Sequence, residues 1–104
     1  MTKVYGIKSC DTCRKALKSL DATLQDIRAE PLSIEQLERF YAEFGDALVN
    51  KKSTTWRGLD EAERSREPIA LLSDHPTLMK RPVIDLDGRL YLGWGKDVQA
   101  TLEV

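Results

Sequence analysis

The stretch "KVYGIKSCDTCRKALKSL", residues 3–20, holds both cysteines of the chain and sets the order of its first elements. Lys3–Ile7 is rich in β-branched and aromatic residues and is followed by polar residues, which predicts a strand. Residues 11–20, "DTCRKALKSL", place apolar side chains three and four positions apart, which predicts a helix with one apolar face. Cys10 is therefore expected between the end of a strand and the start of a helix.

The rest of the chain alternates less regularly. Residues 22–28 read as a second strand. Ser33 and Gln36 form a capping-box pattern before an apolar stripe that runs from Ile34 to Phe44, which predicts a helix that ends at Gly45. Further helices are expected from Asp60 toward Ser65, over residues 67–75 and over the tail at 96–104.

Residues 81–94, "RPVIDLDGRLYLGW", predict a hairpin. Asp87-Gly88 is a turn pair, and Val83 and Asp85 alternate with Ile84 and Leu86 before it. The order is therefore β-α-β, a helical middle, and β-β-α. This order is that of an α/β thioredoxin-like (glutaredoxin-like) fold. It predicts a mixed four-stranded sheet, parallel at the front and antiparallel at the back, with a helical insertion between strands 2 and 3.

Composition limits the function classes. The 104 residues suit one domain, 1–104, with the insertion at roughly 33–75. A net charge of −1 gives no pull toward nucleic acid. No apolar run approaches the ~20 residues of a membrane span, and the N-terminus does not resemble a signal peptide. We therefore expect a cytoplasmic protein, where thiols stay reduced, and a monomer without a membrane partner.

The position of Cys10 favours reactivity. The first amides of a helix have no helical partners and the helix dipole favours negative charge, so a thiolate there has a lowered pKa. Arg14 and Lys15 add positive charge nearby. Cys13 lies one turn later, where it could act as a resolving thiol or simply pack in the core.

A zinc site is not expected, because it needs about four ligands and the chain offers two cysteines and one histidine, His75. His75 is expected to cap or pack at a helix end, and no metal site is predicted.

Three motifs in this order resemble the arsenate reductase-like family, the ArsC/Spx group, and specifically its YffB-like branch. They are "YGIKSCDTCRKA" at residues 5–16, "NKKSTTWRGLDEAER" at 50–64 and "HPTLMKRPVI" at 75–84. The resemblance covers nearly the whole chain. It implies a thioredoxin-like fold, with Cys10 as the nucleophile, Arg81 beside it, and Pro82 after a cis peptide bond next to the reactive thiol.

Arg81 also has a physical case, since a guanidinium stays protonated and binds an oxyanion or carboxylate with two donors. The alternative is a surface arginine flanking a strand. Arg14, Lys51 (with Lys52) and Arg57 are further candidates for substrate binding, or else solvated side chains. The arginine triad that the resemblance implies is incomplete, because Asn50 and Leu92 stand near the other expected positions.

The leading hypothesis is a small thiol oxidoreductase with no bound cofactor. Cys10 would form a covalent intermediate that is released by Cys13 or by glutathione, the expected reducing co-substrate. A glutaredoxin- or thioredoxin-type protein is the other expected partner. One alternative is a redox-sensing module that binds RNA polymerase, as in the Spx branch. The other is a glutathione- or glutaredoxin-linked arsenate reductase.

Overall fold

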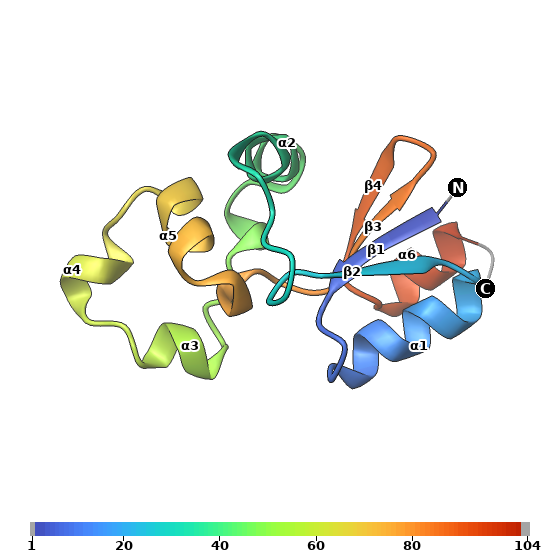
Figure 1. The fold of residues 1–104 in the computed structure, drawn as a ribbon, viewed down its shortest axis with the longest axis horizontal. Coiled ribbons are helices and arrows are strands. Elements are labelled where there is room, and N and C mark those ends of the chain that lie inside the picture. Colours follow the sequence, from blue (N-terminus) through green and yellow to red (C-terminus); the bar gives the residue numbers. More distant parts are fainter. Residues whose placement is uncertain (1, 103–104) are drawn as a thin grey trace. The chain divides into compact units, whose positions relative to one another are not determined.

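A computed structural model describes residues 2–102, which fall into two compact units. The sheet unit combines the chain up to Glu30 with the chain from Arg81 onward, and the helical unit is Pro31–Lys80 (Figure 1). The single domain over 1–104 stays a prediction. Residues 103–104 of the expected tail helix lie outside the described residues.

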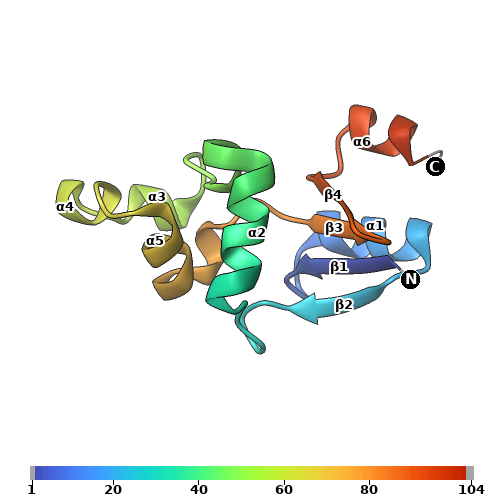
Figure 2. The ribbon, with the colours of Figure 1, turned by 90° about the horizontal axis from the view of Figure 1, so that it is seen from above.

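The sheet has the strand order β2-β1-β3-β4. Its strands are β1 (Thr2–Gly6), β2 (Thr23–Asp26), β3 (Val83–Leu86) and β4 (Arg89–Leu92). β1 and β2 are parallel, whereas β1–β3 and β3–β4 are antiparallel. Parallel neighbours need a crossover, which α1 (Asp11–Leu20) supplies (Figures 1 and 2). The predicted fold class is confirmed, and a last helix, α6 (Lys96–Thr101), follows the hairpin.

The hairpin turn forms at the predicted pair. Asp87 and Gly88 have φ values of 50° and 96°, the left-handed conformation that a two-residue turn requires at both positions. Successive side chains of a strand point to opposite faces of the sheet, and the neighbours Val83 and Ile84 are both fully buried. β3 is an interior strand, and both of its faces are covered at this end.

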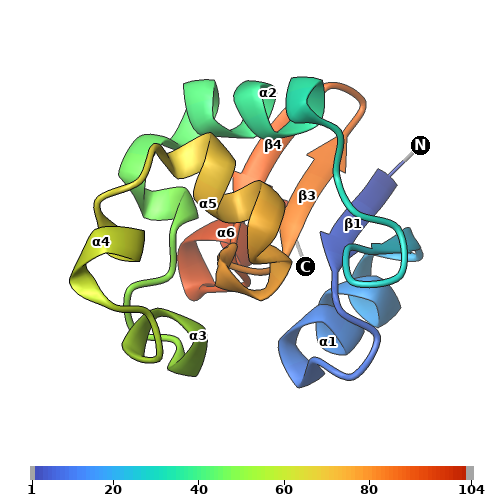
Figure 3. The ribbon, with the colours of Figure 1, turned by 60° about the vertical axis from the view of Figure 1, so that its left-hand side comes forward.

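The helical unit contains six short elements, which Figure 3 shows from a second side. They are α2 (Ile34–Phe44), η1 (Gly45–Leu48), α3 (Thr54–Arg57), α4 (Glu61–Arg64), α5 (Pro68–Asp74) and η2 (Pro76–Leu78). The capping box of α2 is confirmed, since Ser33 Oγ accepts from the Gln36 amide and the Gln36 side chain accepts from the Ser33 amide. The single-turn helix α3 was not predicted. Its N-cap is Ser53, whose Oγ accepts a hydrogen bond from the Trp56 amide, as Ser33 does for α2.

The core of the helical unit includes Leu37 and Phe40 on α2 and Leu71 and Leu72 on α5. Ile34, the first residue of the predicted apolar stripe, is instead 48 % exposed. Backbone hydrogen bonds join the segment around the end of η1 to the end of the unit, from Lys80 to the Leu48 carbonyl (2.8 Å) and from Asn50 to the Leu78 carbonyl (2.9 Å).

Gly6, the last residue of β1, lies directly against Cys13 of α1. A methyl group at Gly6 would overlap the Cys13 sulfur and approach its Cβ to 3.2 Å. The absence of a side chain at Gly6 is therefore what lets α1 seat Cys13 on the end of the strand.

We predict that Gly6→Ala lowers the free energy of unfolding by about 1–3 kcal/mol, the usual cost of overpacking a tight site. Urea denaturation would measure this loss. Gly58→Ala is the control, because an added Cβ there meets its nearest atom at an ordinary 3.5 Å. In a Cys13→Ala background the Gly6→Ala loss should shrink, since the overlapping sulfur is gone. An equal loss in both backgrounds would contradict the assigned cause.

Candidate functional site around Cys10

Cys10 is the N-cap of α1, as its place in the sequence predicted. Its backbone is extended (φ −81°, ψ 119°), its amide donates to the Ile7 carbonyl at 2.9 Å, and its carbonyl accepts from Arg14 N–H at 3.0 Å. The side chain therefore faces the first turn of α1, where the amides of Thr12 and Cys13 have no helical acceptors.

The pKa of Cys10 lies below its ordinary value. Burial opposes ionisation, but it is outweighed by hydrogen bonding to the sulfur from the Cys13 amide, the Cys13 thiol, the Arg81 guanidinium and the Thr12 amide. The result is a partly exposed thiol that ionises easily, which is what a nucleophilic cysteine requires.

Cys13 has the opposite character. Its side chain is fully buried, and burial together with the neighbouring Cys10 raises its pKa to about 11. Both cysteines are free thiols. Cys13 consequently donates to the Cys10 sulfur and supports the Cys10 thiolate while staying protonated itself.

Arg81 and Pro82 are brought to the same place from the far end of the sequence. The Arg81–Pro82 peptide bond is cis, as the resemblance implied, and Pro82 is buried at the start of β3. The Arg81 side chain reaches Cys10 and lowers its pKa. Cys10, Cys13, Arg81 and Pro82 therefore all belong to the sheet unit, although more than 65 residues of sequence separate the cysteines from the Arg81–Pro82 pair.

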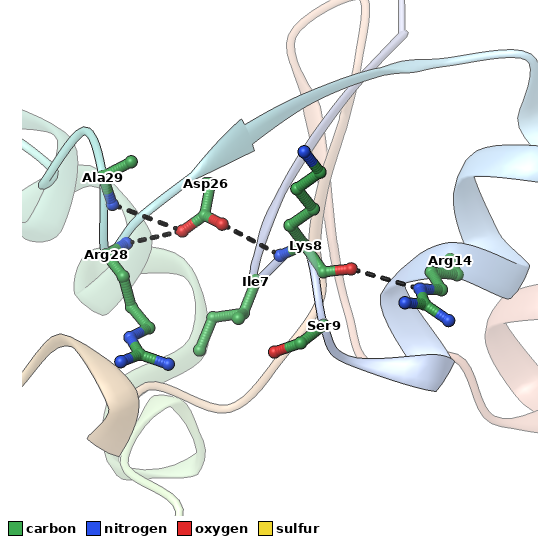
Figure 4. Close-up of a pocket in the computed structure, with 7 residues that line it drawn as sticks. All are labelled: Ile7, Lys8, Ser9, Arg14, Asp26, Arg28 and Ala29. Carbon is green, nitrogen blue, oxygen red and sulfur yellow. Dashed lines mark hydrogen bonds between the residues drawn. The ribbon is translucent and has the colours of Figure 1, made fainter.

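Asp26 is a residue that the sequence reasoning missed. It ends β2, and its carboxylate accepts from the amides of Lys8 (3.0 Å), Arg28 (2.9 Å) and Ala29 (3.3 Å), which lowers its pKa (Figure 4). On the other side of Lys8, Arg14 Nε donates to the Lys8 carbonyl at 3.2 Å. The loop that leads to Cys10 is thus held from β2 and from α1. The signal available in the sequence was an aspartate at the end of a strand, since aspartate side chains often accept hydrogen bonds from the backbone of the loop that follows.

The remaining cationic candidates lie in the helical unit. Lys51 Nζ stands 5.6 Å from the centre of the Trp56 ring, and Arg57 is exposed at the end of α3. Of the predicted substrate-binding residues, the sheet unit itself brings only Arg14 and Pro82 together with Cys10. His75 ends α5 as expected, with Nε2 at 3.4 Å from a Glu63 oxygen.

Over residues 2–102, His, Cys, Asp and Glu side chains form no group of three or more that could hold a metal ion. None of the helices in that range is long and apolar enough to cross a membrane.

The geometry predicts the pH dependence of alkylation. Cys10 should react with iodoacetamide with a midpoint below the ~8.5 of a free cysteine, as followed by mass spectrometry of the Cys10 peptide. Because Arg81 stabilises the charged form, Arg81→Ala should move the midpoint to higher pH. Arg89→Ala, which removes an exposed arginine from β4, should leave it unchanged. An equal midpoint in wild type and Arg81→Ala would contradict the assigned contact.

Comparison with known proteins gives consistent matches along the whole chain. The family model "ArsC family" matches residues 5–101. An uncharacterized protein of Haemophilus influenzae is 42% identical over 111 residues, covering 96% of this chain and 97% of that protein. The global transcriptional regulator Spx of Bacillus subtilis is 29% identical over 108 residues, covering 93% and 82%.

Among solved structures, the protein YffB superposes with a TM-score of 0.85 at 35% identity, covering 97% of each chain. The range of the family match includes residues of both units. This chain belongs to the arsenate reductase-like ArsC family.

Proposed function

We propose that this protein is a small thiol oxidoreductase whose nucleophile is Cys10. The observation that carries the proposal is the lowered pKa of a partly exposed Cys10 at the start of α1, beside Arg81 and a protonated Cys13. A reducing, cytoplasmic compartment is part of the proposal, because both thiols are free.

The first step is attack by the Cys10 thiolate on one sulfur of a disulfide R–S–S–R′. The Cys10–S–S–R bond forms as the S–S′ bond breaks, and R′–S⁻ leaves and takes a proton from water. Arg81 stabilises the attacking thiolate and is placed to pair with a carboxylate or oxyanion on the bound molecule.

The second step releases R–S⁻ when another thiolate attacks the Cys10 sulfur. With a pKa of about 11, Cys13 is ionised in only ~1 molecule in 10,000 at pH 7. Forming the mixed disulfide removes the negative charge of Cys10, but burial, the largest cause of the raised pKa of Cys13, remains. These values favour an external thiol, and we propose glutathione, which leaves Cys10 as a glutathione mixed disulfide that a second glutathione reduces.

Replacement of each cysteine tests both steps. With hydroxyethyl disulfide and glutathione, Cys10→Ser should lose at least ~100-fold in exchange rate, because a hydroxyl is not ionised at neutral pH. If glutathione releases the product, Cys13→Ser should keep a large part of the rate. If Cys13 releases the product, the exchange rates of both variants should fall to a similar extent. Full activity in a folded Cys10→Ser protein would refute the proposal.

A second candidate function is favoured by the match to Spx, a transcriptional regulator. In this case the Cys10–Cys13 pair would act as a redox switch on a surface that binds RNA polymerase. A pull-down with polymerase subunits, using oxidised and reduced protein, separates the two proposals. Absence of binding in both states would remove the regulatory one.

A third candidate, arsenate reduction, follows from the family and the Cys10–Arg81 pair. The two other arginines expected from the resemblance are missing, because their positions fall at Asn50 and near Leu92. The anion site would therefore be incomplete. We expect little arsenate turnover in a glutathione- and glutaredoxin-coupled assay.

A further inference from the structure

A pocket of about 580 Å³ lies immediately before the nucleophile in the sequence. It is lined by Ile7–Ser9, Arg14, Asp26 and Arg28–Ala29, all in the sheet unit (Figure 4). Ser9 is bonded to Cys10, so the pocket opens beside the loop that positions the reactive sulfur. Its volume falls within the ~300–1,000 Å³ of small-molecule sites.

The charged side chains that line the pocket are mostly cationic. Lys8, Arg14 and Arg28 are set against one carboxylate, that of Asp26. Both Asp26 oxygens already accept hydrogen bonds from backbone amides, Oδ2 from Lys8 and Oδ1 from Arg28 and Ala29. The Asp26 carboxylate therefore holds the loops around the pocket.

The side chains of Lys8 and Arg28 extend in different directions from the pocket wall. In Figure 4 the Arg28 guanidinium and the Ser9 hydroxyl extend to the same side as the Ile7 side chain, whereas the Lys8 ammonium extends the opposite way. Arg28 is exposed, and a guanidinium binds a carboxylate with two parallel hydrogen bonds. The apolar Ile7 side chain lies between Ser9 and Arg28.

We infer that this pocket is a carboxylate-binding subsite that selects acidic, peptide-sized thiols and disulfides for Cys10, with Arg28 as the specificity-determining residue. The inference rests on the proposed function, because the selected molecule reacts at Cys10. The subsite holds the carboxylate end, and the sulfur of the same molecule reaches the thiolate. Without it, the negative charge of the Cys10 thiolate would itself repel an anionic substrate.

The first test compares three disulfides of similar size: dithiodipropionate (anionic), hydroxyethyl disulfide (neutral) and cystamine (cationic). The rate of mixed-disulfide formation on Cys10 is measured by mass spectrometry and divided by the rate with free N-acetylcysteine. The ratio of anionic to neutral rates should fall ~10-fold in Arg28→Glu, keep most of its value in Arg28→Lys, and decrease with added salt.

The matched control is Arg89→Glu, which makes the same charge change in β4, at the sheet edge opposite β2. Its ratio should equal that of the wild type. If Arg28→Glu and Arg89→Glu give the same ratio, the subsite is wrong while the proposed function stands. If none of the disulfides reacts with Cys10, the proposed function fails.

A binding measurement tests the subsite separately from the chemistry. S-methylglutathione is acidic and cannot exchange, and NMR titration should shift the amide signals of Lys8, Ser9, Arg28 and Ala29. These shifts should weaken strongly in Arg28→Glu. Unchanged amide signals at millimolar S-methylglutathione would overturn the inference, whether or not Cys10 is active.

Discussion

The stabilisation of a negative charge on Cys10 by the first turn of α1 is the interaction on which the rest of the site depends. Burial works against this charge, and donors on three residues, Thr12, Cys13 and Arg81, outweigh it. The donors differ in origin: two amides come from the helix start itself, and the guanidinium comes from Arg81, which directly follows the helical unit and precedes β3. The fold brings these parts together because β1 and β3 are hydrogen-bonded neighbours.

The same geometry makes the two cysteines unequal. Cys13 sits under Gly6 with no solvent access, so it stays protonated and acts as a hydrogen-bond donor to its neighbour. A Cys-x-x-Cys pair can act as a dithiol only if its second thiol ionises, and burial opposes this here. In the proposed cycle, the mixed disulfide is therefore released by an external thiol. A cationic pocket beside the Cys10 loop is consistent with an acidic external thiol.

Much of the fold could be read from local patterns, each with a local cause. The capping box at Ser33, the Asp87-Gly88 turn and the strand-to-helix position of Cys10 follow from hydrogen bonds and backbone preferences within a few residues. The burial of both faces of β3 could not be read this way, because it depends on what covers the sheet. The short helix α3 was also missed, although its N-cap residue, Ser53, was an available local signal.

The sequence by itself determined the order of elements and the place of Cys10 between the first strand and the first helix. Only the tertiary structure decided how the two cysteines divide their roles, because the pKa of Cys13 depends on burial beneath Gly6. It also placed Asp26 and Arg28 in the lining of the pocket next to the loop that precedes Cys10. These residues lie 16 and 18 positions after Cys10 in the sequence and reach its loop only because β2 pairs in parallel with β1.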